Sequence, residues 1–201
     1  MKSTRDYITE KAFEQYLTNG YEGVSISVLQ KSLNIGRATL YYHFSNKEDL
    51  FNEVINVYVT SIFQKHLGMI DKSIVTIPDL IQIFTDMHEF IKQTILLTNI
   101  SNAKFSNYTS LIIHAYMHNP NFADYMHYVI EETYQSWVFG IQNSIKKGDV
   151  RDNINVKILA SIFTGIKDNV SLGLDDKIIL LPNEDNNYNI NCLYLYNLIK
   201  K

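Results

Sequence analysis

Residues 35–50 read IGRATLYYHFSNKEDL, and this segment carries most of the information on the fold. Leu40 and Phe44 lie four residues apart, the spacing of one helix face, so a short helix is predicted over residues 37–44. Asn46 precedes the run Lys-Glu-Asp, which is typical of a helix start, where an Asn side chain caps free amides and the helix dipole favours anions. The segment therefore predicts a short helix followed directly by another.

The residues before this segment predict a second short helix, with Ser25 as its N-cap. Its inner face would carry Ile26, Leu29 and Leu33. A tight turn at residues 34–36 (Asn-Ile-Gly) would join the two short helices, because Asn and Gly both tolerate positive φ, and Ile35 is expected to be buried. Two short helices around a tight turn form a helix-turn-helix, whose second helix enters the major groove of DNA.

This arrangement resembles the TetR family of bacterial transcriptional regulators. Residues 39–50 match the family pattern T-L-Y-x-H-F-x-x-K-E-x-L, and residues 20–26 (GYEGVSI) resemble its lead-in. Three residues depart from the family: Gln30 replaces a small Ala, Asn34 a turn Gly and Gly36 a Ser cap. The resemblance implies an all-α fold, with a helix-turn-helix DNA-binding domain at residues 1–50 and a helical ligand-binding and dimerisation domain at 51–201.

The resemblance and side-chain chemistry together imply a set of DNA-contacting residues. The fork of Arg37 suits a guanine edge, and Lys47, at a helix start, suits a phosphate. The remaining candidates offer hydroxyl, imidazole or methyl contacts: Ser25, Ser27, Ala38, Thr39, Tyr41, Tyr42 and His43. Two alternatives stay open, because Tyr41 can serve packing alone and Ser25 can serve only as a helix cap.

Charge is distributed unevenly along the chain. The 201 residues carry 18 Lys and Arg against 21 Asp and Glu, but residues 1–47 hold six basic and four acidic side chains. Residues 23–47 contain three cations and no acid. Such an acid-free stretch beside an acidic remainder suggests a surface for an anion such as DNA.

Composition excludes several classes. The chain is 46% hydrophobic with eight Gly and three Pro, which is unlike a disordered chain, and Cys192 as the single cysteine excludes an internal disulfide. The N-terminus has no signal-peptide pattern, and the longest uncharged run, residues 105–123, contains Asn, His, Ser and Pro, so we expect a cytoplasmic protein without a membrane partner. The sequence also lacks the motifs of common catalytic sites. No nucleotide-binding or hydrolase motif occurs, so neither an enzyme nor a cofactor is expected.

The two histidines at 114 and 118 do not predict a metal site. His114 and His118 share a helix face but lack a third local ligand, so no metal site is expected.

The remaining pattern predicts helices at residues 78–97, 104–118, 122–147, 156–172 and 192–199, and a loop at 182–191. The helix that starts after Asn46 would continue to about residue 66, and residues 177–181 fit either a strand or a helix. The resemblance implies a homodimer formed by the last two helices, a palindromic operator, and release by a small molecule.

Residues 105–139 are rich in aromatic side chains and Met, which suits a hydrophobic or aromatic effector, although the same pattern fits an ordinary core. The effector candidates are Tyr108, Tyr116, Tyr134 and Trp137. The competing hypothesis for the whole chain is a helical protein-interaction module that has lost DNA binding.

Overall fold

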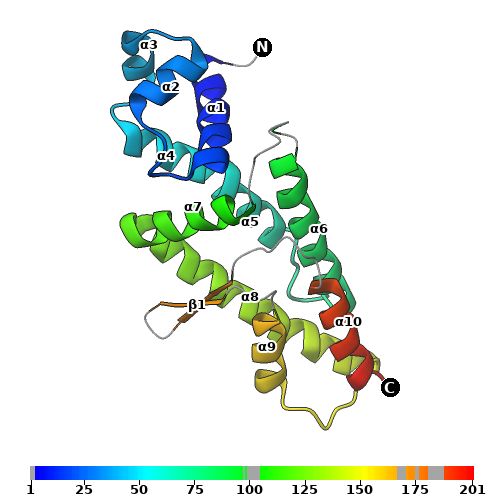
Figure 1. Cartoon of the computed structure of the whole chain (residues 1–201). Helices are drawn as coiled ribbons and strands as arrows, with labels where there is room; N and C mark the ends of the chain where they lie inside the picture. The colour runs from blue at the N-terminus through cyan, green and yellow to red at the C-terminus, as the bar shows by residue number, and fades with distance from the viewer. Residues whose placement is uncertain (1–2, 97, 99–104, 167–170, 175–176, 181–187) are drawn as a thin grey trace. The chain divides into compact units, whose positions relative to one another are not determined.

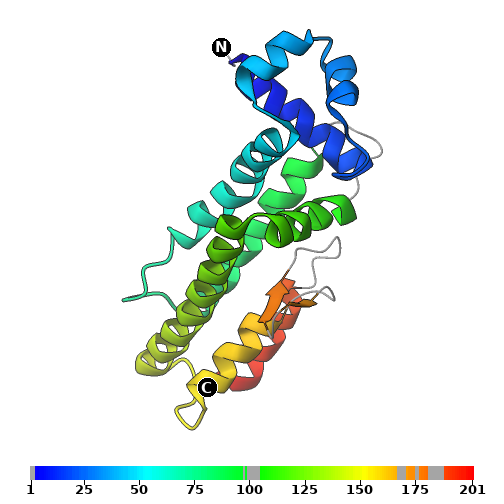
Figure 2. The same ribbon diagram turned by 90° about the vertical axis from the view of Figure 1, so that its left-hand side faces the viewer.

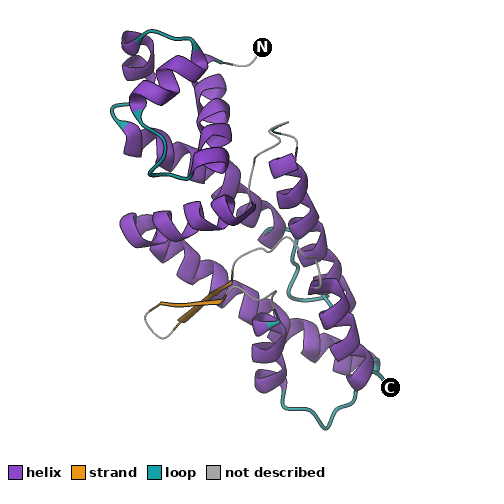
Figure 3. Cartoon of the chain, viewed as in Figure 1, coloured by secondary structure: helices purple, strands orange, loops and turns teal. Residues whose placement is uncertain are grey.

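The computed structural model describes residues 3–96, 98, 105–166, 171–174, 177–180 and 188–201 (Figure 1). Its regular structure is almost entirely helical, which confirms the predicted all-α class (Figure 3). The elements are α1 (Thr4–Asn19), α2 (Ile26–Leu33), α3 (Arg37–His43), α4 (Lys47–Ile55), η1 (Asn56–Thr60), α5 (Ser61–Leu67), α6 (Ile77–Leu96), α7 (Phe105–His118), α8 (Pro120–Lys147), α9 (Val156–Gly165), β1 (Ser171–Leu174), β2 (Lys177–Leu180) and α10 (Tyr188–Ile199). Among the described helices, none combines the length and the apolar character needed to cross a membrane.

Local capping explains where four of the helices begin. The Ser3 hydroxyl accepts a hydrogen bond from the amide of Asp6, whose carboxylate accepts one from the amide of Ser3, and this capping box starts α1. Ser25, Asn46 and Asn155 each accept a bond from the amide three residues later. The caps at Ser25 and Asn46 and the start of α9 at residue 156 confirm predictions from the sequence.

Contacts divide the chain into two compact units, which we describe separately. The first unit comprises residues 1–62 and 92–123, and the second comprises residues 63–91 and 124–201. In the first unit, α1 packs against α2, α4 and α7. Its fully buried side chains include Phe13, Tyr16 and Leu50, and Asn107 on α7 donates a 2.8 Å hydrogen bond to the carbonyl of Leu17 on α1.

The helix that follows Asn46 contains a π-helical segment, η1, that was not predicted. α4, η1 and α5 form one run to Leu67, close to the predicted end. A π turn takes backbone groups out of the regular α-helical register. The buried Tyr108 hydroxyl donates a 2.9 Å hydrogen bond to the carbonyl of Tyr58 in this segment, and the Tyr58 ring stacks on Phe13 at 3.9 Å. Contacts between elements distant in sequence therefore stabilise η1.

The core of the second unit forms around Trp137 on α8. The Trp137 ring stacks on Phe163 of α9 with 4.4 Å between centroids, and Phe84 of α6 lies 5.7 Å away. Asn143, nearly two turns further along α8, donates hydrogen bonds to the carbonyls of Lys72 (3.2 Å) and Val75 (2.9 Å). These bonds attach the segment before α6 to α8.

The predicted helix over residues 156–172 is too long. α9 ends at Gly165, and Ile166 has left the helical conformation. Residues 171–174 instead form β1, which pairs antiparallel with β2, so that Ser171 lies opposite Leu180 and Leu174 opposite Lys177. This hairpin lies between α9 and α10 along the chain (Figure 2). The hairpin shows that residues 177–180 form a strand. α9 ends at Gly165, a weak helix former, and residues 171–174 pair with this strand instead of continuing the helix.

The last helix is longer than predicted. α10 begins at Tyr188, so residues 188–191 of the predicted loop are helical, whereas residues 182–187 lie outside the described part of the chain. Cys192, Tyr196 and Ile199 are buried along one helix face. Burial of this face outweighs the low helix propensity of the neighbouring Asn residues.

Candidate nucleic-acid interface

The turn between α2 and α3 has the backbone conformation that its residues favour. Asn34 adopts the left-handed conformation, with φ 52° and ψ 41°, and its amide bonds to carbonyls of α2. Gly36, which stands where the family has a Ser cap, has a φ of −69° and is the extended N-cap of α3. Ile35 is half-buried rather than buried, because the burial under α3 comes from other side chains.

Buried side chains fix the inner face of helix α3, and Arg5 binds the C-terminal end of the helix. Leu29, Leu40 and Phe44 are essentially inaccessible to solvent, as predicted for the inner surface of a helix-turn-helix. The sequence did not reveal the role of Arg5. Its guanidinium donates a 2.7 Å hydrogen bond to the carbonyl of His43, lies 4.3 Å from the centre of the Phe44 ring, and forms an ion pair with Glu53.

The outer face of α3 presents polar and aromatic side chains. Arg37, Ala38 and Thr39 are exposed, Tyr41 is 40% exposed and Tyr42 is 84% exposed, whereas His43 is half-buried. The Arg37 guanidinium lies 5.4 Å from the centre of the Tyr41 ring. An exposed Arg beside aromatic rings on a short helix can reach base edges and sugars. Each of these base contacts stays a prediction.

Two serines at the start of α2 lie beside each other. The Ser25 hydroxyl caps the amide of Val28 at 3.2 Å and lies 2.8 Å from the Ser27 hydroxyl. Ser25 is therefore the N-cap of α2, as predicted. Both side chains belong to exposed residues. Hydroxyls at a helix start can also contact phosphate, and that role stays a prediction for both.

Lys47 occupies the first position of α4 and is half-buried. Its ammonium donates a 2.7 Å hydrogen bond to the carbonyl of Tyr21 and lies 3.7 Å from the centre of the Tyr21 ring. Burial lowers the pKa of Lys47 below its ordinary value of 10.5. A single carbonyl uses one of three ammonium protons, so a phosphate can still be bound beside the free amides at the start of α4.

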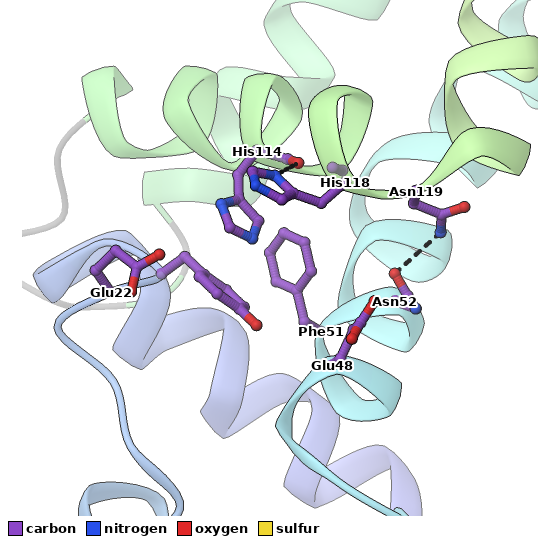
Figure 4. A pocket seen from close by; sticks show the side chains of 9 residues that line it. Glu22, Glu48, Phe51, Asn52, His114, His118 and Asn119 are labelled. Carbon is purple, nitrogen blue, oxygen red and sulfur yellow. Dashed lines mark hydrogen bonds between the residues drawn. The ribbon is translucent and has the colours of Figure 1, made fainter.

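A pocket of about 320 Å³ lies in the first unit, between the helix-turn-helix and α7. Figure 4 shows His114 and His118 of α7 facing Phe51 of α4, and the hydrogen bond from Asn119 to Asn52. The lining residues are Tyr21, Glu22, Glu48, Phe51, Asn52, His114, Ala115, His118 and Asn119. Sequence spacing identified the histidine pair, but not that it faces the helix-turn-helix.

The four effector candidates are divided between the two units. Tyr108 and Tyr116 are buried in the first unit, whereas Trp137 is buried and Tyr134 half-buried in the second. The Trp137 Nε1 atom has no hydrogen-bond partner among the described residues. A surface pocket of about 270 Å³ in the second unit has a different lining: Gln64, Leu67, Gly68, Tyr125, Tyr128 and Glu132.

Comparison with known families identifies the helix-turn-helix. The model of the bacterial regulatory proteins of the tetR family matches residues 8–54, the segment that contains α2, α3 and almost all of α4. Residues 8–54 are therefore similar to the DNA-binding segment of the TetR family. This match confirms the resemblance found in the sequence of the helix-turn-helix.

One curated TetR-family relative is the negative regulator IcaR of the biofilm operon icaADBC from Staphylococcus epidermidis. It is 30% identical over 66 residues, which make up 31% of this chain and 36% of IcaR. The match thus spans about a third of that relative. Negative regulation of the icaADBC operon is stated for IcaR itself.

Solved structures share the fold over more of the chain. The ketosteroid transcriptional regulator KstR2 of Mycobacterium tuberculosis covers 100% of this chain and 97% of its own, with a TM-score of 0.60 at 15% identity. The TetR-family regulator PfmR from Thermus thermophilus covers 81% of each chain, with a TM-score of 0.56 at 17% identity. At these identities the similarity shows the TetR fold alone.

Proposed function

We propose that this protein is a TetR-family regulator, a ligand-responsive repressor that binds a palindromic operator as a homodimer and is released by a small molecule. The observation that carries the DNA-binding part is the exposed outer face of α3. It lies within an acid-free stretch, residues 23–47, and its inner face is buried. A short helix held in this way can enter the major groove without deforming. Binding to operator DNA would take place in the bacterial cytoplasm.

The proposal gives different side chains different contacts with DNA. Arg37 would read a base edge, because its planar fork matches the two acceptors of guanine. Lys47 would bind a phosphate together with the first amides of α4. We further propose residues 1–50 as the DNA-binding domain and residues 51–201 as the ligand-binding and dimerisation domain.

Dimerisation is supported by apolar side chains that stay exposed on the last two helices. On α9, Ile158 and Ile162 are 60% and 46% exposed, and on α10, Tyr194 and Leu198 are 68% and 54% exposed. Such side chains on helices are typical of a surface that another chain covers. Two reading helices placed about 34–36 Å apart would add their contacts on a palindromic site.

The effector is proposed to be hydrophobic or aromatic, and its candidate contacts are Tyr108 and Tyr116 in the first unit and Tyr134 and Trp137 in the second. Support comes from Trp137, since a buried indole N–H without a partner in the described chain is costly and would be satisfied by an acceptor on a ligand. Trp137 is also the single Trp, so quenching or a shift of intrinsic fluorescence would report binding there. Release from DNA requires that the effector bind the two conformations with different affinities.

A salt-series binding titration tests the function directly. The DNA flanking the protein's own gene is compared with random DNA of equal length. Tight binding to the flanking DNA alone, by two protomers per site, supports a self-regulating dimer. Equal, weak binding to both DNAs supports a regulator whose operator lies elsewhere. If neither DNA binds at low salt, the DNA-binding function is refuted, and the helical interaction module becomes the better hypothesis.

A further inference from the structure

Four side chains in the first unit form a continuous stack, which we call the Lys47 column. The Lys47 ammonium lies 3.7 Å and the His114 ring 3.8 Å from the centre of the Tyr21 ring. Two groups this close to one ring centre must occupy opposite faces, since they would otherwise overlap. The His118 ring then stacks on His114 at 4.2 Å, so the order is Lys47, Tyr21, His114, His118.

The column connects three parts of the chain that are distant in sequence. Lys47 starts α4, Tyr21 lies between α1 and α2, and His114 lies on α7. Phe51 of α4 is only 2% exposed and supports the column from the side, with its ring centre 4.6 Å from that of Tyr21 and 5.3 Å from that of His114. A displacement of His114 therefore reaches the Lys47 ammonium through one ring.

We propose that His114 is a positioning residue for DNA binding: through Tyr21 it holds the Lys47 ammonium at the start of α4, and its protonation loosens the Lys47 column. This inference rests on the proposed DNA-binding function. It adds a control point on α7, outside the helix-turn-helix, and makes phosphate binding sensitive to pH.

The groups that face His114 determine the sign of the pH effect. Burial is the largest influence and lowers the pKa of His114, and electrostatic interactions with His118 and Lys47 lower it further. The carboxylates of Glu22 and Glu48 act in the opposite direction, but the pKa still lies below its ordinary value of 6.5. The column therefore contains neutral imidazole. Its stability is complete above pH 6.5 and declines as the pH falls from 6.5 to the lowered pKa.

Metal binding does not explain the histidine pair. A metal site needs three or more ligands of suitable type, and the described residues contain no such group of His, Cys, Asp or Glu. The Nδ1 atom of His118 lies 2.9 Å from the carbonyl of His114, a distance at which this nitrogen must donate its proton. Ring stacking and this hydrogen bond account for the arrangement of the pair.

The first test needs no DNA. NMR titration of the His114 ring in the full-length protein is compared between wild type and Lys47→Met. Removing the ammonium should raise the pKa of His114, because the charge of Lys47, stacked on the other face of the Tyr21 ring, lowers it. Lys31→Met removes an exposed cation of α2 and should leave this pKa unchanged. An unchanged pKa in Lys47→Met, or an equal shift in both variants, would overturn the column.

The second test is a double-mutant cycle on DNA affinity. His114→Ala should weaken binding to operator and random DNA alike, by about 3- to 10-fold, and lower the salt slope by up to about 0.9 for each phosphate that the protein no longer binds. In the Lys47→Ala background the same change should cost less than about 2-fold, because coupled residues are not additive. Full additivity would overturn the positioning role.

A third comparison isolates protonation from packing. His114→Phe keeps a ring against Tyr21 but cannot be protonated, so it should bind DNA like wild type at pH 7.5 and lose less affinity than wild type as the pH falls from 7.5 through 6.5 to the pKa measured for His114 in the first test. His127→Asn, a change in the second unit, should keep the wild-type pH profile. Identical profiles for wild type and His114→Phe would refute the switch. If wild type binds no DNA at low salt, the proposed function fails, and the NMR titration still decides whether the column couples Lys47 to His114.

Discussion

Replacing Asn143 on α8 tests how the start of α6 is held in place. Asn143 is only 9% exposed, and its amide donates to two carbonyls, those of Lys72 and Val75. Leu is an apolar side chain with the same branching point as Asn but offers no donor. Asn143→Leu therefore removes both hydrogen bonds while it keeps most of the packing.

The expected cost follows from these two bonds. Each is worth about 0.5–1.5 kcal/mol net, and a carbonyl left buried without a partner adds a desolvation penalty. Val75 is 5% exposed, so its carbonyl is the more costly of the two to leave unpaired. We expect Asn143→Leu to lower the free energy of unfolding by about 2–3 kcal/mol. For a chain of this size that corresponds to a Tm lower by roughly 4–12 °C.

Thermal and urea unfolding followed by circular dichroism provide the assay. Gln142→Leu is the matched control, because Gln142 is the exposed neighbour and its replacement should change stability by less than about 0.5 kcal/mol. Asn143→Asp keeps the size but places a carboxylate against two carbonyls, so it should be at least as destabilising as Leu at pH 7. An Asp variant as stable as wild type would refute the reasoning, because the donors would then contribute nothing.

Three further predictions use the same protein. Asn34→Ala should lower the free energy of unfolding by roughly 1 kcal/mol and Asn34→Gly by less, because positive φ is strained for Ala and not for Gly; equal losses in urea unfolding would contradict this. Tyr108→Phe should cost about 0.5–1.5 kcal/mol through removal of the bond to Tyr58, and unchanged stability would show that η1 needs no hydroxyl. Lys47→Ala should weaken binding to every DNA sequence and reduce the salt slope by about one unit, whereas Arg37→Ala should lose discrimination at one base pair per half-site; an equal loss on all sequences would make Arg37 a phosphate contact.

Features that depend on neighbouring residues could be predicted from the sequence. The caps Ser25 and Asn46 and the left-handed Asn34 follow from side-chain geometry within four residues, and all three are confirmed. Gly36 does not use the positive φ that Gly tolerates, because the turn needs only one left-handed residue and Gly36 starts α3 in an extended conformation. The DNA-contact roles within this motif stay predictions.

Features that depend on distant residues could not be predicted in this way. The pattern after Asn46 has a continuous helical period, and η1 interrupts it only where Tyr108, from another helix, supplies a hydroxyl. The contacts of Arg5 with α3 and the Lys47 column likewise join residues more than 25 positions apart. Contacts of this kind produce no periodic pattern in the sequence. The spacing of His114 and His118 therefore predicted a shared helix face, but not their contacts with Tyr21 and Phe51.

The discontinuous first unit affects how hybrid regulators can be built from this protein. Residues 1–62 share that unit with residues 92–123, and the chain passes from one unit to the other inside α5, α6 and α8 rather than in loops. A fragment cut after residue 62 would lack α7, including Tyr108 and His114, and would expose the side chains that α7 covers on α1. A graft intended to carry operator specificity into another regulator should therefore transfer both segments together, with junctions placed at matching helical turns.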